Sequence, residues 1–363
     1  MKRHASGATR KLLAETNTSD KWTRLREHRD DPQRHIERVL RWRASRRPAS
    51  TTVSAAAKNW RLGLVYAGIT ASAWGILPIA LKTLLVSMDP FTITWYRFVA
   101  AAALTALFLQ ARGGMPRLRQ LDRRGWALLA VAAGGLTGNY VFYLLGLSHI
   151  SPGSAQLLIQ LAPMFLLIGG LVVFGESFSP LQWSGLLVMV IGLGLFLKDR
   201  LIELISFAGE FATGVVLLFL ASVTWAAYGL CQKLLQGQLS GQSILLVIYF
   251  SASLVLLPPA RPETVMSLGP WALALLAFCS LNTVIAYGSF AEALKFWDAS
   301  RISAVLALTP LLTMLFASLL DALPFGYVSE ESLDWVSIAG AILVVSGSAT
   351  CALAGRRTVP ATT

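Results

Sequence analysis

The sequence predicts an all-α integral membrane protein, with ten transmembrane helices arranged as two inverted five-helix repeats. Three observations predict this fold class. Hydrophobic residues make up 55% of the 363 residues and charged residues only 14%, whereas soluble domains carry about 25% charged residues. The charged residues leave long apolar runs between them, and one succession of residues occurs twice along the chain.

Ten segments are apolar and long enough to cross a bilayer as helices, which takes about 20 residues each. The run from Gly125 to Gly175 is too long for one crossing, and it divides at the turn signal His149-Ile150-Ser151-Pro152-Gly153. Pro90 to Ala111 is apolar apart from Arg97. Solid apolar runs indicate helices, because barrel strands would alternate polar and apolar residues. The expected spans are residues 62–84, 90–111, 125–147, 153–174, 180–198, 211–233, 241–259, 268–292, 302–320 and 334–354.

Most of the net charge of +12 belongs to the N-terminal tail, residues 1–61. The tail holds 16 of the 31 Lys and Arg residues and 6 of the 19 Asp and Glu residues, a net charge of +10. The rest of the chain is near neutral, so the basic composition does not indicate nucleic-acid binding. The tail is expected to be either a disordered arm or a segment held on anionic lipid by its arginines. Its opening residues lack the apolar core of a cleavable signal peptide.

The distribution of Lys and Arg predicts the orientation in the membrane. With the N-terminus in the cytoplasm, the connections and C-terminus place ten Lys and Arg residues inside and four outside, without counting the tail or Arg97. Short loops rich in Lys and Arg stay in the cytoplasm. Both termini, including the C-terminal residues 356–363, are therefore expected in the cytoplasm. A bacterial inner membrane is the expected location, and a eukaryotic organelle is the alternative that the long basic tail leaves open.

Three pairs of motifs carry the internal repeat. Ala71-Ser72-Ala73-Trp74 followed by Lys82 recurs as Ser222-Val223-Thr224-Trp225 followed by Lys233, 151 residues later. Tyr140 to Leu147 recurs as Tyr287 to Leu294, and Leu161-Ala162-Pro163 recurs as Leu308-Thr309-Pro310, both 147 residues later. The first repeat then covers residues 62–198 and the second 211–355. Because five crossings is an odd number, the second repeat enters the membrane from the opposite side, an arrangement that serves alternating access in transporters.

The residues offer little for catalysis. Cys231, Cys279 and Cys351 lie singly in expected spans and three of the four histidines lie in the tail, so no metal site or disulfide framework is expected. No GK[ST] phosphate loop occurs, and neither ATP nor another cofactor is expected. The alternative function is a membrane enzyme acting on lipid or polyprenyl phosphates, for which Glu330, Glu331 and Asp334 would supply the acidic cluster.

Several motifs follow one another in a characteristic order. They are Trp74 in the first span, Arg97 in the second, Tyr140 to Leu147 in the third, and Pro163 with Gly175-Glu176 in the fourth. In this order the chain resembles the EamA-type transporters of the drug/metabolite transporter superfamily, over about residues 62–355. The resemblance implies export of small metabolites or amino-acid-like compounds. The ninth span departs from the pattern, since Leu320-Asp321-Ala322 replaces the second Gly-Glu, and Tyr249 stands opposite Arg97.

Ten polar and aromatic residues are candidates for contacting a substrate. Gln156 and Gln160 share one stripe of the fourth span with Pro163, whose ring leaves a carbonyl without its helical partner. They either contact substrate or hydrogen-bond to neighbouring helices. The others lie at comparable depths in both repeats and either suit a zwitterionic or aromatic solute or form a packing seam. They are Trp74, Asn139, Tyr140, Tyr143, Trp225, Tyr228, Asn282 and Tyr287.

The charged residues of the spans are the remaining candidates. Arg97 lies about 10 Å into its helix at 1.5 Å per residue, and it either holds a substrate carboxylate or bonds to helix-end carbonyls. Lys82 and Lys233 are expected to anchor span ends at the interface. Glu176 and Glu292 are the candidates for proton coupling, with a salt bridge to Lys295 as the alternative for Glu292. No acidic residue lies at the middle of a span, which favours facilitated diffusion or exchange.

Overall fold

The computed structural model describes residues 60–174, 179–207, 209–235, 237–297, 299–322 and 334–354. Within these ranges every regular element is a helix. The N-terminal tail and Glu176 lie outside the described residues, and so do Glu330 and Glu331. The expectations attached to them therefore stay predictions.

Helices cover all the segments that were expected to cross the membrane. Several begin at a side-chain cap: Asp89 accepts from two amides at the start of one helix, and Ser179 forms a capping box with Gln182 at the start of another. The helices are α4 (Trp60–Leu84), α5 (Pro90–Ala111), α6 (Arg123–His149), α7 (Pro152–Leu158), α8 (Leu161–Phe174), α9 (Pro180–Phe196), α10 (Leu201–Ser206), α11 (Gly209–Leu235), α12 (Gly241–Leu256), α13 (Pro270–Phe296), α14 (Ala299–Leu306), α15 (Thr309–Asp321) and α16 (Trp335–Ala354), with short 3-10 turns at Leu118–Gln120, Lys198–Arg200 and Pro262–Ser267.

Eight helical segments of the described chain are long and apolar enough to cross a membrane. A ninth results if Pro180–Phe196 and Lys198–Ser206, which are bent by 61° relative to each other, count as one span. The apolar helix α12, Gly241–Leu256, is shorter. The described part of the chain is thus all-helical with eight or nine candidate spans, and the number of ten remains a prediction.

Two of the expected spans are broken, which corrects the expectation of continuous helices over residues 153–174 and 302–320. The fourth span divides into α7 and α8, and the ninth into α14 and α15. Pro163 has no N–H for the Ile159 carbonyl, which instead accepts from the Ala162 amide at 2.9 Å. Pro310 stands 147 residues later beside the second break. Gln156 and Gln160 therefore do not share one continuous helical stripe, since Gln160 lies in the break.

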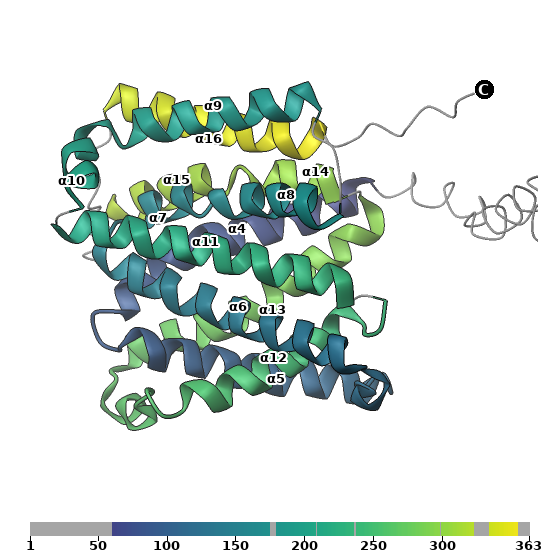
Figure 1. Cartoon of the computed structure of the whole chain (residues 1–363). Helices are drawn as coiled ribbons and strands as arrows, with labels where there is room; N and C mark the ends of the chain where they lie inside the picture. The colour runs from purple at the N-terminus through teal and green to yellow at the C-terminus, as the bar shows by residue number, and fades with distance from the viewer. Residues whose placement is uncertain are drawn as a thin grey trace, which may run out of the picture. The chain divides into compact units, whose positions relative to one another are not determined.

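The most extensive helix contacts join the first half of the chain to the second. Helix α6 packs along α11, α9 along α16, α4 along α13, and α5 along α12. Figure 1 shows α9 and α16 at one edge, α5 and α12 at the opposite edge, and α4, α6, α11 and α13 between them. The largest buried cluster includes residues from both halves, among them Leu81, Leu144, Leu218 and Val344. The two halves therefore share one core.

Glycines set the close approach of α9 and α16. A Cβ atom on Gly192 would lie 2.6 Å from the Val344 amide nitrogen, and one on Gly347 would lie 2.5 Å from the Gly185 carbonyl oxygen. Small residues let helices approach this closely where lipid supplies no hydrophobic drive between them.

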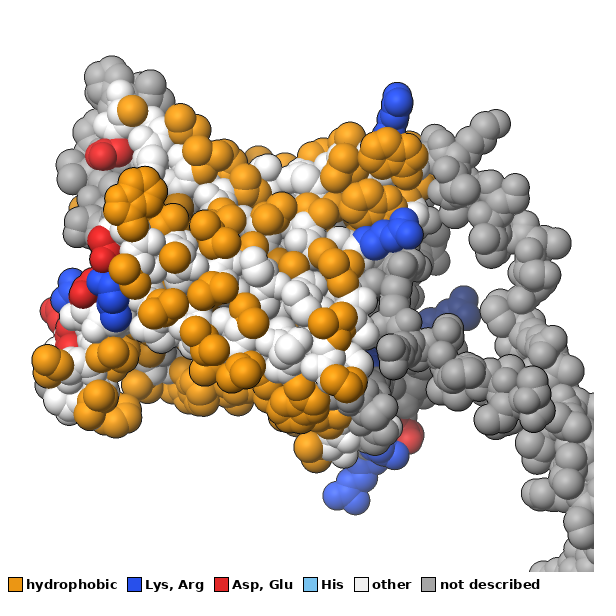
Figure 2. Space-filling model, turned by 90° about the horizontal axis from the view of Figure 1, so that it is seen from above, with side chains coloured by type: hydrophobic (Ala, Val, Ile, Leu, Met, Phe, Trp, Pro, Cys, Tyr) orange, Lys and Arg blue, Asp and Glu red, His pale blue; other side chains and the backbone are white. Residues whose placement is uncertain are grey.

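The exterior has the distribution expected for contact with lipid. Figure 2 shows hydrophobic side chains along the helices of one face and charged side chains gathered toward its two ends. Large apolar side chains such as Val172, which is 82% exposed, stand on the surface between them. At one end Lys198 forms ion pairs with Asp199 at 2.6 Å and Asp334 at 2.8 Å, which links the end of α9 to the start of α16.

Candidate substrate-binding site

A buried arginine lies between the two halves. Arg97 of α5 is 4% exposed, and its Nε donates to the Thr283 hydroxyl of α13 at 3.2 Å. Its guanidinium carbon lies 4.6 Å from the ring centroid of Tyr140 on α6, a cation–π arrangement. The ion pairs found in the described part of the chain involve other residues. Arg97 thus carries a buried positive charge with a polar and an aromatic neighbour and without a described carboxylate partner.

Four tyrosines near one another, one of them in contact with Arg97, form what we call the tyrosine cluster: Tyr140, Tyr228, Tyr249 and Tyr287. They come from α6, α11, α12 and α13, and they lie close enough to interact electrostatically. The Tyr140 side chain is in hydrogen-bonding contact with those of Tyr287 and Thr283. The cluster meets the guanidinium through the ring of Tyr140, and its members come from both halves of the chain.

The Phe98 ring packs between two members of this cluster. Its centroid lies 4.7 Å from that of Tyr140 and 5.7 Å from that of Tyr249. Phe98, Tyr249 and Thr283 were missed as candidates. The sequence held a signal for Tyr249, because it stands opposite Arg97 in the repeat, whereas nothing in the sequence marked the contact of Thr283 with Arg97.

Trp74 connects the tyrosine cluster to the broken fourth span. Its ring lies 5.5 Å from Tyr287 in an edge-on arrangement and 6.2 Å from Phe290. Its carbonyl accepts from Gln156 Nε2 at 3.2 Å, and Gln156 Oε1 accepts from the Tyr143 hydroxyl at 3.0 Å. This chain of contacts joins α4, α6, α7 and α13, so Trp74, Tyr143, Gln156 and Tyr287 are brought together.

Three amide candidates bond to the backbone of helices from the other half. Asn139 Nδ2 donates to the Ala221 carbonyl at 2.9 Å, and Asn282 Nδ2 donates to the Ala73 carbonyl at 2.8 Å. Gln160 Nε2 donates to the Ala307 carbonyl at 3.2 Å, so it bridges the two helix breaks. For Gln160 this contact is the interhelical hydrogen bonding that the sequence left open as an alternative, and all three contacts join the halves of the molecule.

The remaining candidates make contacts of their own. Trp225 is half-buried on α11 and packs beside the tyrosine cluster. Lys82 donates to the carbonyls of Leu147, Ser148 and Ile150 at 3.0 to 3.3 Å, so it satisfies the C-terminal end of α6. The Lys233 ammonium lies 4.2 Å from the Phe174 ring centroid.

Of the two glutamates proposed for proton coupling, only Glu292 belongs to the described residues. Glu292 lies in the last turns of α13 and is half-buried. The side chain of its expected partner Lys295 falls outside the description, and so does the whole of Glu176.

Asp334 is the described member of the acidic group that the enzyme alternative would need, and it makes structural contacts. Asp334 pairs with Lys198 and caps α16 by accepting from the Ser337 amide at 2.8 Å. The Lys198 ammonium, followed by Ser337, holds the pKa of Asp334 well below its usual range. In the described ranges no three His, Cys, Asp or Glu side chains converge as metal ligands.

Comparison with known proteins gives the family. The sequence model of the EamA-like transporter family matches residues 61–198 and again residues 212–352. A Haemophilus influenzae protein described as an uncharacterized transporter is 38% identical over 301 residues, 82% of this chain and 97% of its own length. The uncharacterized inner membrane transporter YhbE of Escherichia coli K12 is 34% identical over 81% of this chain and 92% of its own.

A more distant relative and a solved structure are also similar to the chain. A probable amino-acid metabolite efflux pump of E. coli K12 is 22% identical over 78% of this chain and 92% of its own. One solved crystal structure, 20% identical, superposes with a TM-score of 0.57 over 82% of this chain and 99% of its own, which supports the fold. With its candidate spans, the chain is a multi-pass membrane protein and a transporter, not an enzyme. The chain belongs to the EamA-like transporter family.

Proposed function

We propose that the protein is a secondary transporter that exports small zwitterionic metabolites or amino-acid-like compounds by alternating access. The observation that carries the substrate class is Arg97, a buried cation with no described carboxylate partner, placed between the halves against the ring of Tyr140. A relative in E. coli and another in Salmonella typhimurium, each 22% identical, are described as probable amino-acid metabolite efflux pumps. Their description supports the same class.

The chemistry of the site favours a ligand with both charges. An uncompensated buried charge is costly, and a carboxylate that binds both terminal nitrogens of the guanidinium offsets that cost. The faces of Trp74 and the tyrosine cluster then suit an ammonium group through cation–π contact. In this pose the substrate is the missing counter-ion of Arg97.

Matched contacts in the two halves support the inverted repeat with ten spans. At positions related by 147 and 151 residues, Asn139 donates to the Ala221 carbonyl and Thr70 donates to the Ala286 carbonyl. Exchanging the halves converts the α6–α11 pair into α13–α4 and leaves α5–α12 and α9–α16 paired with each other. This is the pattern that two copies of one five-helix unit, residues 62–198 and 211–355, would produce around a shared axis.

Alternating access would use the breaks in the fourth and ninth spans. A carbonyl freed by Pro163 and the Gln160–Ala307 contact lie where the two broken helices meet. Broken helices in transporters line the substrate path and move with their half. The described acidic residues lie near helix ends, so we propose exchange or facilitated diffusion, with both termini in the cytoplasm of an inner-membrane protein.

Counterflow in proteoliposomes tests this function. Vesicles preloaded with a mixture of unlabelled amino acids should take up labelled amino acid in a saturable, trans-stimulated manner. Vesicles with Tyr287→Ala or Gln160→Ala protein should lose most of this flux at equal protein content, whereas Val172→Ala, a change on the lipid-facing surface, should not. Flux that never saturates, or equal flux from all variants, would refute the proposal.

A further inference from the structure

The repeat relates the α6–α11 interface to the α13–α4 interface, and the two differ at one position. On α6, Gly135 packs so closely on α11 that a Cβ atom would lie 2.8 Å from the Thr224 carbonyl oxygen. The residue 147 positions later is Asn282, on α13, and its side chain stands between α13 and the equivalent carbonyl, that of Ala73 on α4. Asn282 therefore holds α4 and α13 apart at a level where α6 and α11 touch.

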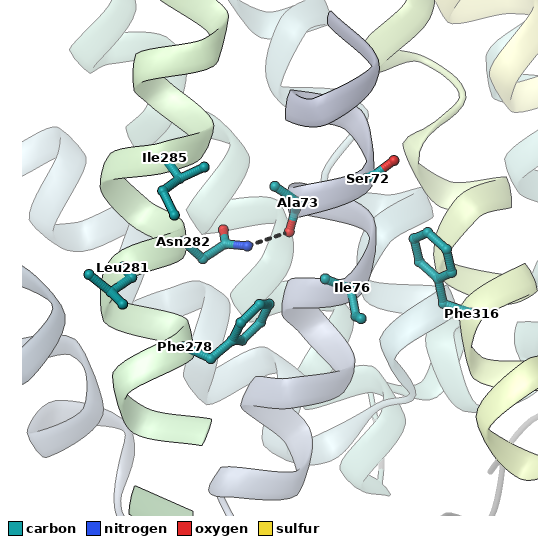
Figure 3. Close-up of a pocket in the computed structure, with 8 residues that line it drawn as sticks. All are labelled: Ser72, Ala73, Ile76, Phe278, Leu281, Asn282, Ile285 and Phe316. Atoms are coloured by element: carbon teal, nitrogen blue, oxygen red, sulfur yellow. Dashed lines mark hydrogen bonds between the residues drawn. The ribbon is translucent and has the colours of Figure 1, made fainter. Parts of the chain in front are cut away.

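A groove occupies the space beside Asn282. It has a volume of about 320 Å³ and runs between α4 and α13, with α15 contributing one side (Figure 3). Leu281 and Ile285 are half exposed on its rim, at 48% and 53%. Because these helices are membrane spans, that rim faces lipid. The lining carries no charged residue and is apolar apart from Ser72 and Asn282; its larger apolar members are Ile76, Phe278, Leu281, Ile285 and Phe316.

One polar atom in the lining has no partner. Asn282 is 4% exposed; its Nδ2 donates to Ala73, while its Oδ1 is buried without any hydrogen bond. The bond to the Ala73 carbonyl fixes which end of the amide is the oxygen, since a carbonyl accepts. An unmet acceptor in hydrocarbon costs free energy that a donor from a ligand would recover.

We propose that this groove binds a small uncharged molecule with an aromatic or aliphatic body and one N–H or O–H donor, which enters from the lipid phase and donates to Asn282 Oδ1. The volume matches the lower end of small-molecule sites. The two phenylalanines supply ring contacts, and the uncharged lining excludes the zwitterions proposed for the Arg97 site. The groove is a second site, separate in chemistry from the one between the halves.

Indole and N-methylindole test the proposal, because they share a body and differ in the single donor. Binding is measured as the excess of labelled probe in nanodiscs that contain the protein over empty nanodiscs. We expect saturable binding of indole at one site per chain, with N-methylindole about tenfold weaker, the effect of one hydrogen bond to an otherwise unmet group. Equal binding of the two probes, or no saturable binding, would overturn the assignment of Asn282 Oδ1.

Variants then locate the site. Asn282→Leu should weaken indole to the affinity of N-methylindole and leave N-methylindole unchanged. Ile285→Trp, on the lipid-facing rim, should remove binding of both probes by filling the groove, and it keeps the proposal testable if Asn282→Leu does not fold. The control Val172→Trp adds the same ring at another lipid-facing position and should leave both affinities unchanged. Binding that survives Ile285→Trp would place the probe elsewhere and refute the groove.

Discussion

Two neighbouring glycines on α6, each replaced by alanine in its own variant, should separate the energetic cost of close helix packing from the gain in helix propensity. A Cβ atom on Gly135 would lie 2.8 Å from the Thr224 carbonyl oxygen and 3.0 Å from the Tyr228 amide nitrogen, whereas a Cβ atom on Gly134 would meet nothing within 4 Å. Carbon and oxygen atoms rest at about 3.3–3.6 Å, so Gly135→Ala must push α11 away by roughly 0.5 Å. Overpacking of this kind costs about 1–3 kcal/mol.

The adjacent variant Gly134→Ala isolates that cost. Both changes gain the same helix propensity of about 0.5–1 kcal/mol, so this contribution cancels in the comparison. Gly135→Ala should therefore be less stable than Gly134→Ala by about 1–3 kcal/mol, measured as the free energy of unfolding in mixed detergent micelles. Because Tyr228 belongs to the tyrosine cluster, counterflow should fall for Gly135→Ala alone. Equal stability of the two variants would refute the close contact between α6 and α11.

Three further changes have defined outcomes. Arg97→Lys should lower counterflow at least tenfold, because one ammonium cannot replace two parallel bonds to a carboxylate; unchanged flux would assign Arg97 a structural role. Lys82→Met should lower the free energy of unfolding by about 1–2 kcal/mol, since three carbonyls at the end of α6 lose their charged donor; an unchanged midpoint would contradict that contact. Asp334→Asn should lower the melting temperature above about pH 4, where the free carboxylate is ionised. Because the folded pKa is depressed, the difference from the unmodified protein should vanish as the pH falls through it, and a difference that grows with acid would contradict the pairing with Lys198.

The apolar runs were enough to predict the helices, because a membrane span must satisfy its own backbone and needs a fixed length. The two breaks were not predicted, although Pro163 and Pro310 were visible at matching places. A proline in a span can either kink or interrupt the helix, and the outcome depends on how the freed carbonyl finds another donor, as the Ile159 carbonyl does in the Ala162 amide.

The sequence named many residues of the candidate site, but it did not predict which of them contact one another. The repeat identified Tyr140 and Tyr287 as equivalent residues, and the structure brings Tyr140 to Arg97 and Tyr287 to Tyr140. The partners of Asn139, Asn282 and Gln160 lie 82, 209 and 147 residues away in sequence. Such pairings follow from how the halves interlock, which local patterns along one chain do not encode. Nothing in the apolar sequence around Asn282 indicated whether α4 and α13 would pack closely or leave a groove between them.

The pairing of helices across the halves has a consequence for biogenesis. Helix α9 emerges from the ribosome well before α16, and the glycine-lined face on which Gly340 and Gly347 will lie stays uncovered during that interval. Helix α4 likewise lacks its packing partner until α13 has been synthesised. The newly inserted first half is consequently a set of loosely associated spans, and the final helix completes assembly by docking against a partner made more than a hundred residues earlier. Cells that stop synthesis before α16 should degrade the truncated chain.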